Sequence, residues 1–294
     1  MLEFKVLELE DKPVFDRMLS DDPPRISELT FTNLFMWRFK YRPLWAVHDA
    51  CLLIILHGNG DSVIGLPPAG TGNKAIALDI LWDAIASRSD EPAISRVDSQ
   101  FVENFVDTKR FRVSKDRDNS DYVYRTEDLI KLTGNRYHQK RNHVNKFLKN
   151  YRFEYQVLND KLVRDFLDLQ DSWCQLKDCE SNEDLMAEDR AVFEALLHYK
   201  YLGFRGGAIL IEDKVEAFTL GEKLSQDTAV IHVEKANPEI PGLYATINQQ
   251  FCQHEWSEVT YVNRQQDLGV PGMRKAKKSY HPDHMVDKFT LVRR

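Results

Sequence analysis

The chain has 294 residues, 43% of them hydrophobic and 29% charged, and its formal net charge is -6 at pH 7. This length favours two lobes of ordinary domain size, and the composition excludes disordered and fibrous proteins. Apolar runs such as residues 51–56 are far shorter than the roughly 20 residues that cross a bilayer, and the first residues lack the apolar core of a secretory signal. The sequence therefore predicts a cytoplasmic protein without a membrane-spanning segment.

The N-terminal half alternates between strand and helix signals, which predicts an α+β lobe over residues 1–128. The expected elements are a strand at 4–7, helices from Asp11 and over 26–40, strands at 45–47, 52–56 and 62–66, a helix at 74–87, and a further strand, helix and strand that reach Arg125. The glycines and the asparagine within 57–61 are typical of a turn.

The second half begins with a helix at about 135–150, which we expect to connect two lobes. After it we expect a strand at 153–158, helices at 161–178 and 183–200, three strands within 208–237, a helix at 242–256, and strands at 259–263 and 286–292. This order is how a GNAT-type acyltransferase lobe is assembled, and the first half repeats it loosely. We therefore predict a tandem GNAT-like α+β fold with mainly antiparallel mixed sheets, divided into lobes 1–128 and 129–294.

The four cysteines are Cys51, Cys174, Cys179 and Cys252. The spacing of the closest pair fits neither a zinc knuckle nor a redox CxxC motif. An isolated cysteine is usually a small buried hydrophobic residue, so we expect structural roles for all four. The sequence predicts no metal site.

Basic residues concentrate in two places although the net charge is negative. No acid occurs from residue 129 to 153, and a second basic run lies near the C-terminus. The basic residues are Lys131, Arg136, Lys140, Arg141, Lys146, Lys149 and Arg152 in the first region, and Arg274, Lys275, Lys277 and Lys278 in the second. Such concentration indicates a site for a particular anion, and the alternative is a solvated helix face and a solvated loop.

Three stretches together resemble a known family: GNRYHQKRNHVNKF from Gly134, VIHVEKANPEIPGLYATINQQF from Val230 and YVNRQQDLGVPGMRKAKKSYHP from Tyr261. They are similar to the soluble bacterial proteins grouped with the phosphatidylglycerol lysyltransferase C-terminal domain, over most of the chain. The resemblance implies a tandem GNAT-like fold shared with the Fem peptidyltransferases and with the lysyl-lipid synthases that use aminoacyl-tRNA.

Two candidate proton acceptors lie in the strand VIHVEKAN. Alternation along this strand places His232 and Glu234 on one face. Acyl transfer to an amine requires that the nucleophile lose a proton, so Glu234 is the first candidate for the catalytic base and His232 the second. The alternative is that both side chains form structural pairs, for example with Lys235.

The loop before the helix at 242–256 is where a GNAT enzyme holds the pyrophosphate of coenzyme A on backbone amides. Only Gly242 suits such a cofactor-binding loop, while Pro238 and Pro241 remove two amide donors. This favours an acyl donor other than acyl-CoA, and we expect no required cofactor. An aminoacyl-tRNA already carries an activated ester, so the protein would chiefly position it.

The basic residues would then hold the acceptor end of tRNA. Arg136, Lys140 and His143 follow helical spacing on one stripe, and the second basic run would meet phosphates from another side. Tyr280 would stack on a base or donate a proton, unless it packs against the final strand.

The stretch NRQQDLG places Asn263, Gln265 and Asp267 on one face if the strand continues through it. Two amides and a carboxylate at a strand end would bind a small amino or carboxyl substrate, with Asp267 a further catalytic candidate. The alternative is local hydrogen bonding that caps a loop.

The first hypothesis from these patterns is an aminoacyltransferase that moves an aminoacyl group from aminoacyl-tRNA to an amine or hydroxyl acceptor, either a small molecule or a lipid headgroup. Two hypotheses stay open beside it: an acyl-CoA-dependent N-acyltransferase, and a non-catalytic binding protein on the same fold.

Overall fold

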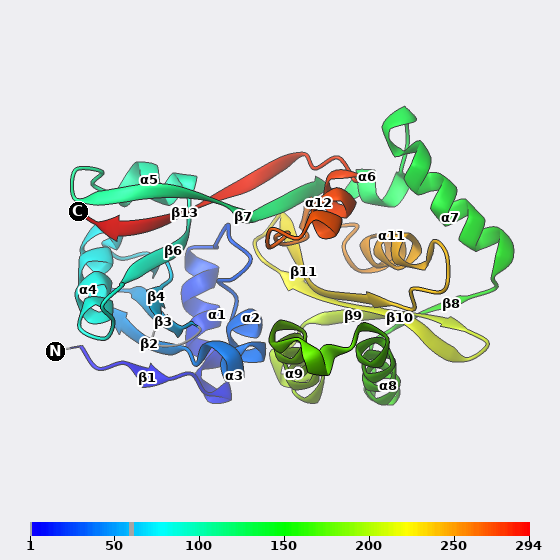
Figure 1. Ribbon diagram of the computed structural model, residues 1–294, viewed down its shortest axis with the longest axis horizontal. Helices are drawn as coiled ribbons and strands as arrows, with labels where there is room; N and C mark the ends of the chain where they lie inside the picture. Colours follow the sequence, from blue (N-terminus) through cyan, green and yellow to red (C-terminus); the bar gives the residue numbers. More distant parts are fainter. Residues whose placement is uncertain (1, 59–61) are drawn as a thin grey trace. The chain divides into compact units, whose positions relative to one another are not determined.

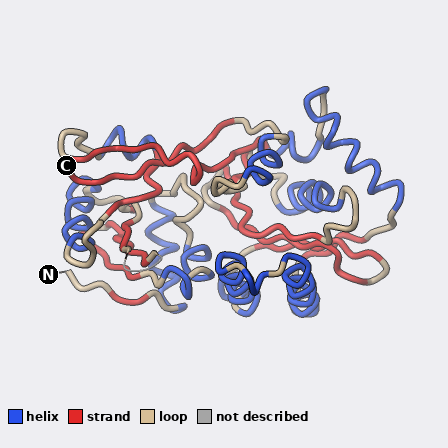
Figure 2. Tube along the Cα trace, in the orientation of Figure 1, coloured by secondary structure: helices blue, strands red, loops and turns tan. Residues whose placement is uncertain are grey.

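The computed structural model describes residues 2–58 and 62–294, and Figures 1 and 2 show their secondary structure. The chain divides into two compact units. Unit 1 consists of Met1–Asp121, Gln266–Gly269 and Met285–Arg294, and unit 2 consists of Tyr122–Gln265 and Val270–His284. Each unit is therefore built from more than one segment of the chain. The turn expected at 57–61 includes residues 59–61, which lie outside the described residues.

Unit 1 is built around a mixed sheet. Its strands are β1 (Lys5–Val6), β2 (Leu44–His48), β3 (Cys51–His57), β4 (Val63–Gly65), β5 (Ala69–Gly70), β6 (Ala93–Asp98), most of β13 (His284–Arg293) and the first part of β7 (Phe111–Arg125). Its helices are α1 (Lys12–Asp21), α2 (Phe31–Met36), α3 (Arg38–Tyr41), α4 (Lys74–Ala86) and α5 (Ser99–Phe105), with a 3-10 turn at Leu9–Asp11. The strands run in the order β1-β2-β3-β4-β6-β13-β7, and the pair β4 and β6 is parallel.

The core of unit 1 lies between the sheet and α4. Every residue of β3 up to Leu56 is buried, as expected for a continuous apolar run, and Leu53 and Ile55 pack with Leu81 and Ile85 of α4. The side chain of Asn73 caps α4, because its Oδ1 accepts from the backbone N–H of Ile76 at 3.1 Å.

The helix expected over 26–40 is wrong in its first part, because α2 begins only at Phe31. Thr30 caps that helix by accepting from the backbone N–H of Asn33 at 3.0 Å. The segment before it belongs to a buried network around Lys288, whose side chain is 0% exposed. Lys288 Nζ lies 2.6 Å from Oε2 of Glu28 and 2.7 Å from Oδ1 of Asp121. Segment 26–29 is therefore held by side-chain pairing rather than by helical bonds.

Unit 2 begins with the last residues of β7 and is likewise built around sheet strands. Its helices are α6 (Thr126–Lys131), α7 (His138–Asn150), α8 (Asp160–Lys177), α9 (Glu183–Leu197), α10 (Tyr199–Leu202), α11 (Leu243–Glu255) and α12 (Pro271–Lys278). Short 3-10 turns cover Asn135–Tyr137 and Cys179–Ser181. Its further strands are β8 (Glu154–Val157), β9 (Arg205–Ile211), β10 (Lys214–Lys223), β11 (Thr228–Ala236) and β12 (Tyr261–Asn263), in the order β7-β12-β11-β10-β9-β8.

The two faces of this sheet are covered by different helices. Figure 1 shows α11 on one side of β9, β10 and β11, and α8 and α9 on the other. Ala217 packs with Leu243 and Ile247 of α11, while its neighbour Phe218 stacks on Phe166 of α8. Within unit 2 all strand pairs are antiparallel except β11 and β12, which pair in parallel through Thr228–Val230 and Tyr261–Asn263. The mainly antiparallel α+β architecture was predicted correctly.

Two local expectations were wrong. The basic run near the C-terminus is not a loop but the helix α12, which begins with Pro271 at its first position. Cys174 and Cys179 are not isolated, because they form a disulfide that joins the end of α8 to the following turn. Cys51 and Cys252 are free and buried, as predicted.

Candidate active site

A cluster of buried polar side chains lies in unit 2 where β12 ends. Arg264, the residue after β12, donates from Nη2 to Oε1 of Glu234 at 2.8 Å, and Nδ2 of Asn248 donates to Oε2 of Glu234 at 2.9 Å. Alternation along β11 directs Glu234 toward the face that α11 covers, and Asn248 belongs to α11. Both carboxylate oxygens of Glu234 therefore have a partner.

Two tyrosine rings lie against the guanidinium of Arg264. Its Cζ is 4.6 Å from the ring centroid of Tyr280 and 5.7 Å from that of Tyr124. Burial raises the pKa of Tyr280 to about 12 and also raises the pKa of Tyr124, so both phenols are protonated at neutral pH. Burial acts to lower the pKa of Arg264, but Glu234 and the two tyrosines raise that pKa above its ordinary value. The guanidinium therefore stays charged.

Lys140, on the first turn of α7, approaches the same tyrosine. Its Nζ lies 4.1 Å from the centroid of the Tyr280 ring. Burial, followed by the positive charge of Arg264, lowers the pKa of Lys140 to about 8, although Glu234 acts in the opposite direction. Three residues singled out in the sequence, Lys140, Glu234 and Tyr280, thus surround Arg264.

Both ring nitrogens of His232 have hydrogen-bond partners. Its side chain is 2% exposed, and Nε2 lies 2.7 Å from Oε1 of Glu222 on β10. Nε2 of Gln265 lies 3.2 Å from Nδ1 of His232, and an amide nitrogen can only donate. Nδ1 therefore accepts, and Nε2–H donates to Glu222. His232 forms the structural pairing that the alternative interpretation describes.

The expected alternation of Asn263, Gln265 and Asp267 on one face is wrong, because β12 ends at Asn263. The side chain of Asn263 accepts from the backbone N–H of Gln265 at 2.8 Å, and Gln265 has a left-handed φ of 59°. Asp267 belongs to unit 1, where it is buried, lies 3.2 Å from Nη1 of Arg117, and accepts from the N–H of Gly269. The structure does not place Asp267 in the cluster around Arg264.

Gly242 stands directly before α11 with a φ of 90°. A Cβ added there would lie 2.3 Å from the carbonyl oxygen of His143 on α7. The glycine is thus required by its backbone conformation and by the close approach of α7. The start of α11, where a GNAT enzyme would hold a pyrophosphate, is packed against a carbonyl.

We expect coenzyme A to bind weakly or not at all. Pro238 and Pro241 remove two amide donors, and the carbonyl oxygen of His143 packs against Gly242 at the start of α11. Isothermal titration calorimetry with coenzyme A and with acetyl-CoA measures this directly. A micromolar dissociation constant would contradict it and favour the acyl-CoA hypothesis.

The two basic regions meet at the beginning of α7. Lys140 contacts Tyr280, and Nε2 of His281 lies 2.9 Å from the carbonyl oxygen of Arg136, so the segment after α12 packs on α7. Some of these cations already have partners: Arg136 pairs with Asp128 at 2.8 Å, and Lys277 donates to the carbonyl of Arg264. His143, Lys275 and Lys278 are exposed, and Arg274 is half-buried.

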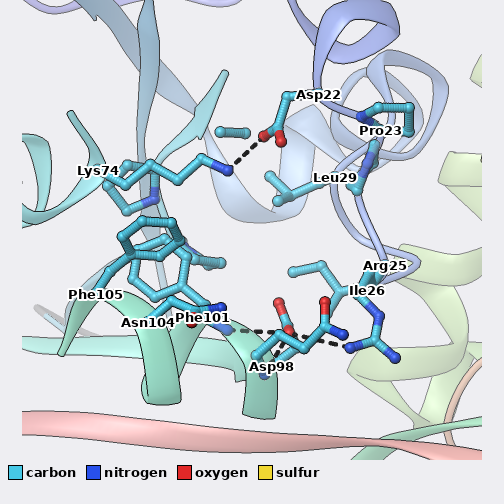
Figure 3. Close-up of a pocket in the computed structure, with 15 residues that line it drawn as sticks. Asp22, Pro23, Arg25, Ile26, Leu29, Lys74, Asp98, Phe101, Asn104 and Phe105 are labelled. Carbon is cyan, nitrogen blue, oxygen red and sulfur yellow. Dashed lines mark hydrogen bonds and ion pairs between the residues drawn. The ribbon is translucent and has the colours of Figure 1, made fainter. Parts of the chain in front are cut away.

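A cavity of about 260 Å³ lies in unit 1 (Figure 3). Lys74 pairs with Asp22 at 2.7 Å on one side, and Arg25 lies 3.8 Å from Asp98 on another. Prolines, Leu29 and two phenylalanines complete its walls. None of the residues that the sequence singles out lines this cavity.

Among the described residues, no group of histidine, cysteine and acidic side chains is arranged to hold a metal ion. Within the same residues, none of the helices combines the length and the apolar character needed to span a membrane.

The two α+β units belong to the tandem GNAT-like fold class. The fold is similar to a tandem GNAT protein from the clavulanic acid biosynthesis pathway (10% identical, 100% of this chain and 98% of that chain, TM-score 0.52). It is also similar to FemX (9% identical, 98% and 97% of the chains, TM-score 0.58).

Within that class, the chain belongs to the family described as phosphatidylglycerol lysyltransferase, C-terminal, which matches residues 23–292. It is similar to a conserved protein of unknown function from Bacteroides thetaiotaomicron VPI-5482 (32% identical, 100% of both chains, TM-score 0.93) and to L-PGS from Bacillus licheniformis (11%, 96% and 92%, TM-score 0.68). A curated relative, the uncharacterized protein MYCGA3080 of Mycoplasmoides gallisepticum, is 23% identical over 174 residues. That match covers 58% of this chain and 56% of the relative, so the chain spans about half the length of the curated protein it matches.

Proposed function

We propose that the protein transfers an aminoacyl group from aminoacyl-tRNA to an amine or hydroxyl acceptor. The observation that carries this proposal is unused hydrogen-bonding capacity in the cluster around Arg264. Nη1 of Arg264 and Oδ1 of Asn248 are buried and have no hydrogen-bond partner. A buried donor and a buried acceptor left unpaired are costly for stability, so a ligand that satisfies both is expected. Membership of the lysyltransferase family supports an acyl-transfer reaction.

Arg264 suits the developing oxyanion of acyl transfer. When a nucleophile attacks the ester carbonyl, negative charge grows on its oxygen, and a fixed donor in a buried site stabilises that charge. Nη1 is such a donor, because Glu234 and the ring of Tyr280 hold the guanidinium in place. Oδ1 of Asn248 would accept from the amino group of the aminoacyl moiety.

Glu234 takes a supporting role in this arrangement. Both of its oxygens are occupied by Arg264 and Asn248, so it has little freedom to approach an incoming amine. We propose that Glu234 positions Arg264 and balances its charge, rather than acting as the base suggested by the sequence.

Two observations favour aminoacyl-tRNA as the donor over acyl-CoA. The start of α11 is packed against α7 at Gly242, which leaves a poor pyrophosphate site. Exposed cations such as Lys275 and Lys278 lie on α12, and the segment directly after α12 contacts the beginning of α7. A polyanionic donor such as the acceptor end of tRNA suits that surface.

A transfer assay tests the proposal. The purified protein is incubated with radiolabelled aminoacyl-tRNAs, each with a set of amine, sugar-hydroxyl and lipid-headgroup acceptors, and products are separated by chromatography and identified by mass spectrometry. We expect one aminoacyl-tRNA to yield a labelled product. Transfer from acetyl-CoA, with none from any aminoacyl-tRNA, would refute the proposed donor.

Binding of tRNA should weaken steeply with salt, because each neutralised phosphate releases counterions. Replacing Lys275 and Lys278, both exposed on α12, with alanine should reduce the slope of log K against log salt by about one unit per lost contact. Filter binding at several salt concentrations measures the slope. The control replaces Lys146 and Lys149, exposed near the other end of α7, and should change the slope less. Equal effects of the two pairs would mean non-specific binding.

A further inference from the structure

Lys140 has an unusual environment for a lysine. An ammonium group has three N–H donors and normally finds oxygen acceptors. Within residues 2–58 and 62–294, Nζ of Lys140 has no hydrogen-bond acceptor and no carboxylate at ion-pair distance, and its contact is the face of Tyr280 at 4.1 Å. A half-buried ammonium without such partners loses hydration that a single aromatic ring replaces only in part.

The charges around Lys140 also oppose its protonation. The guanidinium of Arg264 lies 4.6 Å from the centroid of the same ring, so two cations share one tyrosine. The carboxylate of Glu234 favours the protonated form of Lys140, but Arg264 already pairs with that carboxylate. The other titratable groups around the cluster are Tyr124 from β7, Cys252 from α11, Tyr280 after α12, and Lys277 from α12.

Burial raises the pKa of the Cys252 thiol to about 12, and both phenols have raised pKa values, so these groups are neutral near pH 7. The pKa of Lys140, lowered to about 8 by burial and by Arg264, agrees with the geometry. A substantial fraction of this amine is therefore uncharged under conditions where an ordinary lysine is almost fully protonated.

We infer that Lys140 is the proton acceptor of the transfer reaction, acting on the nucleophile of the acceptor substrate. This inference rests on the proposed function. Near the ring of Tyr280, the neutral Nζ accepts a proton from the attacking amine or hydroxyl as that atom bonds to the ester carbonyl carbon. The charge on the carbonyl oxygen is held by Nη1 of Arg264.

The same lysine completes the reaction. When the tetrahedral intermediate collapses, the bond between the carbonyl carbon and the ribose oxygen breaks, and the Lys140 ammonium donates its proton to that ribose oxygen. The products are the aminoacylated acceptor and tRNA with a free hydroxyl, and Lys140 returns to its neutral form. One proton is taken and one is returned, so no further reactant is required.

This assignment replaces the role that the sequence suggested for Lys140, a contact to donor phosphate. A phosphate contact requires a cation, and exposed lysines such as Lys275 and Lys278 meet that need better. A lysine that is desolvated beside a second cation is instead typical of a group tuned for proton transfer.

Nuclear magnetic resonance tests the ionisation of Lys140 without any substrate. Lysines are labelled by reductive ¹³C-methylation, and the Lys140 signal is identified by its loss in Lys140→Arg. We expect this signal to titrate near pH 8 rather than at the ordinary value of about 10.4. Titration at the ordinary value overturns the inference, whatever the transfer assay gives.

Transfer kinetics test the role of Lys140 as the proton acceptor. Arginine keeps a positive charge but cannot release its proton, so Lys140→Arg should lower the transfer rate by about 10²–10⁴-fold and leave tRNA affinity unchanged. Lys140→Gln should show the same loss, and Lys146→Arg, on the same helix but exposed, should show none. Activity retained by Lys140→Arg, together with weaker tRNA binding in Lys140→Gln, would make Lys140 a phosphate contact and overturn the inference.

The NMR titration and the transfer measurements together distinguish a failure of this inference from a failure of the proposed function. An ordinary pKa for Lys140 in a protein that transfers from aminoacyl-tRNA refutes the inference alone. A pKa near 8 in a protein that transfers from no aminoacyl-tRNA refutes the proposed function, and with it the role of Lys140 in that reaction.

Discussion

Replacing Lys288 with methionine should lower the free energy of unfolding by about 3–5 kcal/mol. The side chains of Lys288 and Asp121 are both 0% exposed, and Nζ of Lys288 also pairs with Glu28. The substitution removes the Lys288 ammonium from the fully buried Asp121, whereas Glu28 keeps its pair with Arg96 at 2.9 Å. The buried carboxylate that loses its cation is what destabilises the fold. Urea unfolding followed by circular dichroism measures the change.

The neighbouring pair between Lys115 and Asp287 supplies the control. It is equally short at 2.6 Å, but its side chains are 51% and 36% exposed. Water already solvates these charges, so Lys115→Met should cost less than about 1 kcal/mol. Equal losses in the two variants would show that the Lys288 network is not the dominant ionic contribution to unit 1.

Replacing Arg264 with methionine should reduce the turnover of aminoacyl transfer by about 10²–10³-fold, the usual effect of removing one donor to an oxyanion. The variant removes the Nη1 donor and leaves Glu234 with Asn248 alone. Single-turnover assays with the aminoacyl-tRNA that yields product in the transfer assay measure the rate. Unchanged turnover would refute the role assigned to Arg264.

The same variant should shift the pH dependence of the rate in a defined direction. The positive charge of Arg264 lowers the pKa of Lys140, and Glu234 raises it. Without Arg264 the carboxylate acts alone, so the pKa of Lys140 rises above about 8 and the acidic limb of the pH-rate profile moves to higher pH. Arg264→Lys is the control, because it keeps the charge but loses the planar fork, and should slow transfer with a smaller shift of that limb.

The strands of unit 2 could be predicted because their signals are local. Residues 208–237 contain short apolar segments separated by polar turns, and Glu212 and Asp213 in the first turn adopt the left-handed φ that such a turn requires. Helix α12 was missed for the opposite reason. None of its residues is buried, so it lacks the apolar spacing by which a helix is recognised, and Pro271 is its only clear start signal.

The alternation expected past Asn263 requires β12 to continue, but a hydrogen bond to the Asn263 side chain ends the strand at that residue. Alternation alone does not reveal that Asn263 will accept from the backbone N–H of Gln265 and turn the chain. Asparagine competes with strand pairing in this way, and the alternative interpretation of the sequence, local bonding in a loop, described the segment better.

The candidate site was only partly visible in the sequence. Glu234, Lys140 and Tyr280 stood out through strand alternation, a basic helix and a motif. Arg264 and Asn248 did not, because they come from the end of β12 and from α11, and no spacing along the chain links them. The only available signal for Arg264 was a single charge directly after a buried strand.

Unit 1 takes its last strand from residues 285–293, where Phe289 pairs with Val97 and Leu291 with Ile94 of β6. During synthesis, residues 1–121 leave the ribosome long before this strand exists. Until then β6 has an open edge, and Glu28 and Asp121 have no Lys288 to pair with. Unit 2 is complete once His284 has emerged. We therefore expect the N-terminal unit to finish folding after the second one, the reverse of the usual order in which domains mature on the ribosome.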